Sequence, residues 1–587
     1  MDFNNFYTGH EFDAYEFLGA HYNRKETTFR VFAPSAFKVS LLAKGQEYTM
    51  KHIYNEHFYE ITLPDIQEGT CYEYRIYHSE QNFTDHADPY GFGMELRPAH
   101  KSIVRDINSY VFQDQDWIKK RKSTKNCPVN IYEMHMGSFR KPSEEPDAWY
   151  SYEEIGDLLV PYLLESGYNY VEFMPICEHP CDESWGYQNT GFYAPTSRYG
   201  TAGQLQKLID MLHRNNIGVI LDFVPVHFAL DEYGLRRFDG SELYEYPSSD
   251  VGVSEWGSCN FMHSRGEVRS FLQSAANYWL KEYHFDGLRM DAVSRIIYWQ
   301  GDERRGENGN AIDFIKVMNK GLKERHADCI LAAEDSTNFP NVTRPVDDGG
   351  LGFDYKWNMG WMHDTLAYFQ SAPKYRTRDY HKLTFSMVYA YNEDYLLPLS
   401  HDEVVHGKAT IVQKMNGQYE DKFSQAKALY LYMILHPGKK LNFMGNEIGQ
   451  LREWDEKREQ DWDLRKYPAH DAFYHFMVTL NKLYLSTPAL YEKDYDREGF
   501  EWLDCNQEKD CIYAIQRNGI SDTVCGIFNF SKEKKRYQPP FKANAEYRIL
   551  LHTDWERFGG QTREVIGTYQ KQVMELAPFS AILLKRM

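Results

Sequence analysis

The sequence predicts a multidomain α/β protein, with a central (β/α)₈ barrel between N-terminal and C-terminal β-sandwich domains. The first observation is that eight short apolar runs alternate with helical periods over residues 129–488. Eight strands, most of them followed by a helix, favour a closed barrel over an open doubly wound sheet. The second observation is that the chain on either side of this region reads as strands only. The domain boundaries that we expect are 1–108, a linker at 109–128, 129–488 and 489–587.

The N-terminal region consists of β-branched or aromatic runs separated by turn signals. FRVFAP (29–34), KVSLLA (38–43), FYEITLP (58–64) and YEYRIY (72–77) alternate in part between apolar and polar residues. Several strands at this spacing are typical of a β-sandwich. The stretch 117–128 is polar and basic and ends in proline, and we interpret it as a linker rather than as a localisation signal.

The eight strand candidates of the middle region are short apolar runs. They are 129–136, 168–176, 218–226, 285–293, 329–336, 353–360, 395–402 and 440–447. Amphipathic stretches with a helical period lie between them, for example 203–216, 267–284 and 311–327. After about residue 490 the chain returns to strands, and this return predicts the C-terminal β-sandwich.

Composition and charge exclude several classes of protein. Among 587 residues, 66 Lys and Arg stand against 85 Asp and Glu, a net charge of −19. This balance argues against a nucleic-acid partner, because phosphate binding depends on cations. No apolar run approaches the ~18 residues that a membrane crossing needs. The N-terminus lacks a secretory signal, and the nine cysteines do not form a disulfide framework. We therefore expect a cytoplasmic monomer that binds neither nucleic acid nor membranes.

Ionisable residues stand at the ends of several predicted strands, where an apolar side chain is the norm. Asp222, the pair Arg289 and Asp291, Glu334, and the pair His401 and Asp402 take these positions, and His227 follows Asp222 closely. A lone carboxylate of this kind is usually a cap or half of a salt bridge. Four strand ends with carboxylates favour one shared pocket, since the active sites of barrels lie at the carboxyl ends of their strands.

Three carboxylates with an arginine and two histidines suit either a metal site or carboxylate catalysis on a neutral substrate. His401 and His406 are five residues apart, which places them about 140° apart around a helix and disfavours a zinc helix. Cys177, His179 and Cys181 could bind zinc, but a second ligand pair is missing. We expect neither a metal nor an organic cofactor.

Retaining cleavage of a glycosidic bond needs a nucleophilic carboxylate and a carboxylic acid ~5–5.5 Å apart. Asp291 and Glu334, on neighbouring strands, suit this pair. Arg289 shares a strand face with Asp291 and would keep it ionised, while Glu334 would keep a proton available. Asp402, with His227 and His401, would bind sugar hydroxyls.

The segments around these residues resemble, in order, the four motif regions of the α-amylase superfamily. They are DFVPVH (222–227), GLRMD (287–291), AED (333–335) and LSHD (399–402). The finer resemblance is to the 1,4-α-glucan (glycogen) branching enzymes, and it runs nearly from end to end. The segments that carry it are IYEMHMGSF (131–139), SWGYQNTGFYAPTSRYGT (184–201), KWNMGWMHDTL (356–366), LPLSHDEVVHGK (397–408) and FMGNE (443–447).

The resemblance implies a retaining double displacement that cuts an α-1,4 bond and transfers the chain to a 6-hydroxyl, with α-1,4-glucan as donor and acceptor. It implies Asp291 as nucleophile, Glu334 as acid/base and Asp402 as stabiliser of the transition state. The residues that it places around the glucose are Tyr187, Asp222, His227, Arg289 and His401. It also implies a glycan-binding-module-like sandwich at 1–108.

At Phe223, Val226 and Asp335 this sequence departs from the residues common in bacterial members of the family that it resembles. These departures affect the shape of the sugar-binding subsites. Two other functions stay open at this point: an α-glucan hydrolase of the same superfamily, and a glycan-binding scaffold without catalysis. The scaffold predicts the loss of a catalytic carboxylate, and none is lost. Transfer rather than hydrolysis requires walls that hold an acceptor. The aromatic loops Trp185–Tyr193 and Trp454–Trp462 are candidates, with ordinary packing as the alternative for both.

Overall fold

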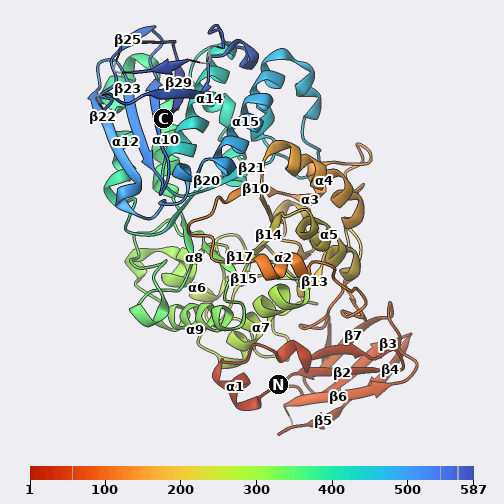
Figure 1. Cartoon of the computed structure of the whole chain (residues 1–587). Coiled ribbons are helices and arrows are strands. Elements are labelled where there is room, and N and C mark those ends of the chain that lie inside the picture. Colours follow the sequence, from red (N-terminus) through yellow and green to blue (C-terminus); the bar gives the residue numbers. More distant parts are fainter. Residues whose placement is uncertain (56, 543, 565–566, 571) are drawn as a thin grey trace. The chain divides into compact units, whose positions relative to one another are not determined.

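The computed structural model describes residues 1–55, 57–542, 544–564, 567–570 and 572–587. Its chain divides into two compact units (Figure 1). Unit 1 comprises Met1–Arg121, His135–Leu158 and Phe173–Phe353, and unit 2 comprises Lys122–Met134, Leu159–Glu172 and Asp354–Met587. Each unit is described by itself below.

All eight predicted barrel strands are present and form a closed barrel, so the predicted fold class is confirmed. In barrel order they are β10 (Asn130–Met134), β11 (Tyr170–Phe173), β14 (Gly218–Phe223), β17 (Gly287–Met290), β18 (Ile330–Ala333), β19 (Tyr355–Trp357), β20 (Tyr395–Leu399) and β21 (Lys439–Phe443). Each strand is shorter than its apolar run because residues at one or both ends of the run belong to the neighbouring loops.

The first part of unit 1 contains two antiparallel sheets, as the sequence predicts. One has the order β1 (Gly19–Tyr22), β2 (Thr27–Phe32), β6 (Phe58–Leu63), β5 (Lys51–Ile53), and the other β4 (Gln46–Thr49), β3 (Lys38–Ala43), β7 (Cys71–Tyr77), β8 (Phe83–His86). In β2 the side chains of Phe29 and Val31 are buried while Arg30 between them is partly exposed. This period of two gives the sheet one apolar face for its core.

The three helices predicted in unit 1 are also present. They are α5 (Ala202–Arg214), α7 (Gly266–Glu282) and α9 (Gly309–Arg325). Thr201 and Gln204 form a capping box at the start of α5, which satisfies backbone donors there. Two short hairpins were not foreseen: β12 (Cys177–Glu178) pairs with β13 (Gly191–Pro195), and β15 (His227–Phe228) pairs with β16 (Cys259–Asn260).

The part of the predicted linker that lies in unit 1 is ordered and contains a helix, α2 (Gln115–Lys120). Trp117 Nε1 donates a hydrogen bond to Asp286 Oδ1 at 2.8 Å. The buried imidazole of His213 lies between two carboxylates, 2.8 Å from Asp114 Oδ2 and 2.9 Å from Asp286 Oδ2. Buried charged contacts therefore fix a segment whose polar composition is typical of a linker.

Unit 2 ends in the predicted β-sandwich. A six-stranded sheet has the order β22 (Phe500–Gln507), β23 (Ile512–Asn518), β24 (Thr523–Asn529), β29 (Ser580–Arg586), β26 (Tyr547–His552), β27 (Thr568–Tyr569). A smaller sheet pairs β25 (Lys535–Tyr537) with β28 (Met574–Leu576). Side chains from both sheets, among them Ile527, Tyr537 and Leu576, share one buried core. Of the helices in the described part of the chain, none combines the length and the low polarity that a bilayer crossing requires.

Candidate active site

Three neighbouring strands of unit 1 place the predicted catalytic residues together. Asp222 of β14 stands in register with Arg289 of β17, and Arg289 stands in register with Ala332 of β18. Asp291 comes directly after β17, and Glu334 comes directly after β18. Because parallel strands end at the same edge of the barrel, the three carboxylates meet there.

Arg289 is the centre of this cluster, with 1 % of its side chain exposed. Its Nη1 donates to Asp222 Oδ2 at 2.5 Å and to Asp291 Oδ1 at 3.0 Å. Its Nη2 donates to Glu334 Oε2 at 2.8 Å. One planar guanidinium thus fixes the positions of three carboxylates, which its rigid fork geometry allows and a lysine ammonium would not.

Opposing effects act on the ionisation of Asp291. Burial raises the pKa of Asp291 well above its ordinary value, the Arg289 guanidinium opposes this, and the neighbouring Glu334 and Asp222 raise it further. Two carboxyls this close share one proton, because the second negative charge is disfavoured by the first.

The residue after Asp291 has an unusual backbone. Ala292 has φ 46° and ψ 45°, the left-handed conformation that residues with a Cβ rarely adopt. This turn lets the Ala292 backbone N–H donate to Glu334 Oε2 at 3.0 Å. Strain of this kind persists where the surroundings fix it, and here it orients a predicted catalytic carboxylate.

Tyr187 reaches the cluster from the loop between β12 and β13. Its hydroxyl donates to Asp222 Oδ2 at 2.6 Å and accepts from Arg289 Nη1 at 3.3 Å. The preceding Gly186 has φ 90°, and a Cβ there would lie 2.3 Å from the carbonyl oxygen of Pro175. Only glycine fits this close approach, so Gly186 fixes the path of the loop that presents Tyr187.

His227 lies on β15 and is buried. Burial, assisted by the nearby Arg295 guanidinium, lowers the pKa of His227 to about 4, so the ring is neutral near pH 7. Its Nδ1 has no hydrogen-bond partner within the described residues. A buried nitrogen of this kind is available to a ligand hydroxyl.

The indole of Trp256 lies beside His227, with ring centroids 5.4 Å apart, and Arg295 stands 4.1 Å from the centroid of the indole. Although 47 % of Trp256 is exposed, hydrogen bonds hold its turn in place: Ser254 Oγ accepts from the backbone N–H groups of Trp256 and Ser258, each at 3.2 Å. Sequence reasoning missed Trp256 and Arg295, because their approach to His227 depends on how these loops fold.

The remaining two predicted residues belong to unit 2. His401 Nδ1 donates to Glu133 Oε1 at 2.5 Å, and the His401 backbone N–H donates to Glu133 Oε2 at 2.9 Å. The fully buried Glu133 of β10 thereby fixes the tautomer and the orientation of His401. Asp402 is half-exposed, and its carboxylate lies 3.5 Å from Lys408 Nζ.

Glu133 was also missed, although the sequence contains a signal for it. It is a charged residue inside the apolar strand run IYEMHM. A buried charge is found in such a run only where it has a partner.

The structure places the two tryptophans at the ends of the loop Trp454–Trp462 in the interior of unit 2. The Trp454 ring packs edge-on against Phe443 at 5.3 Å, and Trp462 packs against Tyr162 at 5.2 Å. Both rings are buried, which favours ordinary packing, the alternative that the sequence left open, over a role as walls for an acceptor. Their contribution is to packing, and Trp454 also supports His401, at 6.4 Å.

The sulfur-containing motif that could bind zinc has ordinary structural partners. The buried Cys177 thiol donates to the carbonyl of Phe192 at 3.7 Å, and His179 Nδ1 donates to the carbonyl of Cys177 at 2.9 Å. Cys181 is exposed and contacts Glu183. Among the residues that the structure describes, no group of three or more His, Cys, Asp or Glu side chains is arranged to hold a metal ion.

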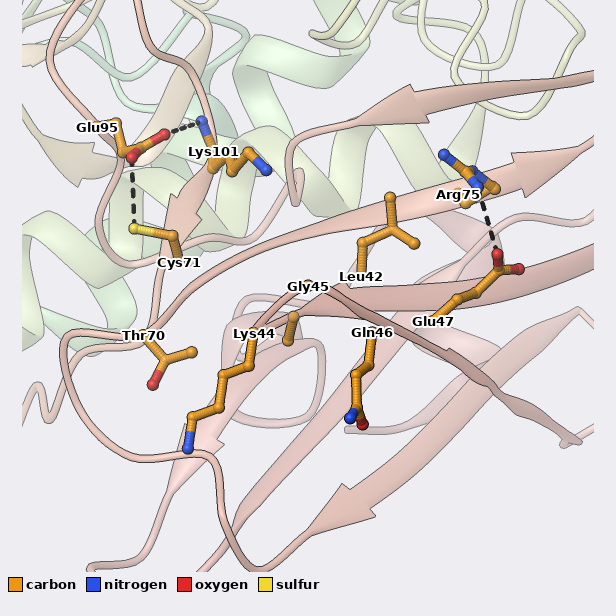
Figure 2. Close-up of a pocket in the computed structure, with 11 residues that line it drawn as sticks. Leu42, Lys44, Gly45, Gln46, Glu47, Thr70, Cys71, Arg75, Glu95 and Lys101 are labelled. Atoms are coloured by element: carbon orange, nitrogen blue, oxygen red, sulfur yellow. Dashed lines mark hydrogen bonds and ion pairs between the residues drawn. The ribbon is translucent and has the colours of Figure 1, made fainter.

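A cavity of about 720 Å³ lies in the N-terminal sandwich and contains none of the predicted site residues (Figure 2). Its charged groups are largely paired: Arg75 contacts Glu47 at 3.2 Å, and Lys101 Nζ contacts Glu73 at 3.1 Å. No aromatic ring lines it, so it offers no stacking platform for a sugar.

Three family models match the chain in order. The N-terminal domain of alpha-1,4-glucan branching enzyme GlgB matches residues 1–90, the alpha amylase catalytic domain matches 153–241 and 257–518, and the alpha amylase C-terminal all-beta domain matches 502–587. A 1,4-alpha-glucan branching enzyme GlgB of Fusobacterium nucleatum is 43% identical over 99% of this chain and 98% of its own length. The chain belongs to the GlgB branching-enzyme family.

Other GlgB relatives agree with this assignment. The enzyme of Geobacillus stearothermophilus is 41% identical over 94% of this chain and 89% of its own length, and that of Bacillus cereus (strain B4264) is 38% identical over 99% and 94%. Among solved structures, a putative alpha amylase from Salmonella typhimurium covers 97% of this chain and 100% of its own, with a TM-score of 0.75 at 19% identity. A pullulanase from Anoxybacillus complexed with maltotetraose has a TM-score of 0.73 at 18% identity, covering 99% of this chain and 89% of its own. At these identities the two structures show the alpha-amylase-type fold alone.

Proposed function

We propose that this protein is a 1,4-α-glucan branching enzyme, which cuts an α-1,4 bond and rejoins the released chain to a 6-hydroxyl. The observation that carries the proposal is the cluster of Asp222, Asp291 and Glu334 around one buried guanidinium, in a chain that matches GlgB enzymes over almost its full length. The substrate class is α-1,4-glucan such as glycogen or amylose. A monomeric state and a cytoplasmic location are parts of the same proposal.

In the first step, an Asp291 carboxylate oxygen attacks the anomeric carbon while Glu334 gives its proton to the departing glycosidic oxygen. The bond between the anomeric carbon and the glycosidic oxygen breaks, and a glycosyl ester forms on Asp291. The leaving chain departs with a new 4-hydroxyl. The two carboxyls share one proton, and a glycosidic oxygen beside Glu334 would accept it. This supports Glu334 as the acid and Asp291 as the nucleophile.

In the second step, Glu334 removes the proton from the 6-hydroxyl of an acceptor glucose. The oxygen attacks the same anomeric carbon from the side where the first chain left, and the ester bond to Asp291 breaks. Two inversions retain the α configuration, and both carboxyls return to their starting states.

The surrounding residues bind and orient the donor glucose. Arg289 holds Asp291 in place for attack, and the Tyr187 ring forms a platform fixed by its bond to Asp222. The neutral His227 is suited to bind a hydroxyl group, and His401 would bind another. Asp402 would stabilise the transition state through contacts that tighten during the reaction.

Transfer rather than hydrolysis depends on how the ester intermediate meets its acceptor. A 100:1 preference for a sugar hydroxyl over water needs only about 2.7 kcal/mol of barrier difference. Positioning of an acceptor beside the anomeric carbon can supply this, since effective molarities of about 10⁵ M are attainable.

Incubation of the pure protein with amylose tests the proposal. We expect iodine absorbance to fall with little gain in reducing ends, and debranching with an isoamylase should then release new short chains. A rise in reducing ends that matches the loss of iodine colour, without new branch points, would identify a hydrolase instead.

A further inference from the structure

The loop 402–409, which begins with Asp402 in unit 2, has an unusual backbone. Three of its residues, His406, Gly407 and Ala409, have φ values of 56°, 79° and 65°. His406 and Ala409 carry a Cβ, and residues with a Cβ rarely adopt this left-handed conformation. Such a backbone persists only where the surrounding groups fix it, so the contacts of this loop decide its shape.

A buried ammonium group holds the carbonyl side of this loop. Lys414 is the last residue of α13 (Ile411–Lys414), and only 7% of it is exposed. Its Nζ donates to the carbonyl oxygens of Lys408 and Ala409, each at 2.7 Å, and to that of Glu403. An ammonium has three N–H donors, so this one can place all three on the loop.

A carboxylate holds the amide side of the same loop. Glu453, from the chain that follows β21, accepts from the backbone N–H of Gly407 at 2.9 Å and from that of Ala409 at 2.7 Å. These two hydrogen bonds lower the pKa of Glu453 below its ordinary value, so the carboxylate is ionised near pH 7. Lys414 and Glu453 together therefore fix the backbone of the loop, and we call this pair the loop clamp.

The buried charge of Lys414 serves the loop rather than a partner elsewhere in the core. Burial lowers the pKa of Lys414 to about 8; Glu403 and Glu453 oppose this shift, and Lys408 adds to it. A buried ammonium costs free energy, which an apolar side chain of similar size would avoid. Only the hydrogen bonds of the ammonium offset this cost, and they end on the loop that carries Asp402.

Asp402 takes its position from this loop. Its side chain is 47% exposed, so burial does not fix it. Lys408, whose carbonyl accepts from Lys414, turns its own Nζ back toward Asp402. This Nζ donates to the Asp402 carbonyl at 2.7 Å and lies 3.5 Å from Asp402 Oδ2. A change at Lys414 therefore reaches Asp402 through Lys408.

We propose that Lys414 and Glu453 are positioning residues for the reaction, which hold the loop 402–409 in the shape that Asp402 needs to stabilise the transition state. The role of Asp402 rests on the proposed function. Since the contacts of Asp402 tighten during the reaction, loss of the clamp lowers kcat more than it raises KM. A displacement of about 1 Å in such a group is enough for a loss of about 100-fold.

The rate at which α-1,4 bonds of amylose disappear, followed by NMR, tests the clamp, because transfer and hydrolysis share this step. We expect Lys414→Met to lower kcat by about 100-fold while KM changes less than about threefold. Lys414→Arg keeps a charge and several donors, so it should recover part of the loss.

Lys427→Met is the matched control for the loss of a buried lysine. Lys427 is 3% exposed, and its Nζ donates at 2.7 Å to the carbonyl of Phe558, outside the loop 402–409. Burial lowers the pKa of Lys427 to about 8, as it does for Lys414. We expect this control to lower the melting temperature and to leave kcat near wild type.

The Asp402→Asn background separates positioning from stability. Lys414→Met should add no further loss of kcat to Asp402→Asn, whereas a merely structural role predicts that the two losses multiply. If thermal melting shows that Lys414→Met is unfolded, Glu453→Gln decides by the same comparison. Its expected loss is about 10-fold, because the amide oxygen can replace only part of what the carboxylate accepts.

Three results would overturn the proposal: wild-type kcat in the clamp variants, multiplied losses in the double variant, or an equal loss of kcat in Lys427→Met. Wild-type activity in Asp402→Asn would also overturn it, and would leave the branching function standing. If the wild-type protein cleaves α-1,4 bonds without forming branches, the branching function falls, and the same comparison of cleavage rates still decides the role of the clamp.

Discussion

At the scale of single residues, the account depends on one arginine that organises three carboxylates. Arg289 contacts Asp222, Asp291 and Glu334 within 3.0 Å, and almost none of its surface is exposed. Removal of one carboxylate would leave part of this buried charge without its partner. The isosteric amides keep the shape of the side chains and remove the chemistry, so they are the right substitutions for testing roles.

Asp291→Asn and Glu334→Gln should each lower turnover on amylose by about 10³-fold or more, because each removes one half of a double displacement. Binding to glycogen should be largely kept. Branch formation measured after isoamylase treatment checks the first expectation, and affinity electrophoresis checks the second. Activity near wild type in either variant would show that the residue has another role.

Glu133 acts through His401, and its replacement should separate positioning from structure. Glu133→Gln can still accept from one of the two N–H groups of His401, but it no longer fixes the ring as a carboxylate does. We expect kcat/KM to fall by about 10-fold to 100-fold, with a smaller effect on the melting temperature. His401→Ala provides the comparison: the double variant should be no worse than His401→Ala alone. Additive losses would mean that Glu133 contributes independently of His401.

At the scale of elements, the segment around α2 is joined to the barrel by a buried charged cluster. Although burial disfavours the charged imidazole, the carboxylates of Asp286 and Asp114 raise the pKa of His213 to about 9. Only the imidazolium can donate from both ring nitrogens, at 2.8 Å and 2.9 Å, to these two carboxylates. Asp114 also contacts His284, and Asp286 contacts Arg121.

The sign of the pH effect follows from the raised pKa of His213. The stabilisation is complete below pH 6.5, the value in the unfolded chain, and is lost as the pH rises through about 9. The size is about 3 kcal/mol, from the shift in pKa. We expect the unfolding midpoint of unit 1 to fall between pH 7 and pH 10, and to fall less in His213→Gln. Parallel curves for the two proteins would contradict this assignment.

The sequence predicted the elements better than it predicted the loops between them, for a physical reason. An apolar run marks each barrel strand in the sequence. Asp222, Asp291 and Glu334 lie at the ends of three of these strands, so the sequence predicted that they meet at one edge of the barrel. His227 was predicted as a site residue, but its hairpin was not. Trp256 lies in 242–256, between the two segments that match the catalytic family model. Nothing local in that stretch indicates that its turn ends against His227.

The sequence also could not predict which polar segments contact buried charged groups elsewhere in the chain. The stretch 117–128 is polar and was interpreted as a linker, yet Trp117 bonds to Asp286, far away in the sequence. Such contacts depend on partners that a local pattern does not contain. The same reason explains why the sequence left open whether the loop Trp454–Trp462 serves an acceptor site or packing, although the structure buries both of its tryptophans.

At the scale of the whole molecule, the order of sandwich, barrel and sandwich agrees with the three family models. The net charge of −19 suits a neutral polymer as substrate, because it provides no attraction for polyanions. The proposed catalytic carboxylates would serve a hydrolase and a transferase equally, because both reactions share the first chemical step. The match to GlgB enzymes along nearly the full chain is therefore what favours a transferase over a hydrolase.

The most direct measurement follows the anomeric protons of amylose by NMR while the pure protein acts on it, with Asp291→Asn as the control. We expect signals of α-1,6 linkages to appear in step with the loss of α-1,4 signals. The reducing-end signals should stay constant, and the control should show no change. Growth of the reducing-end signals without any α-1,6 signal would contradict the central claim that the glycosyl ester on Asp291 is passed to a sugar hydroxyl.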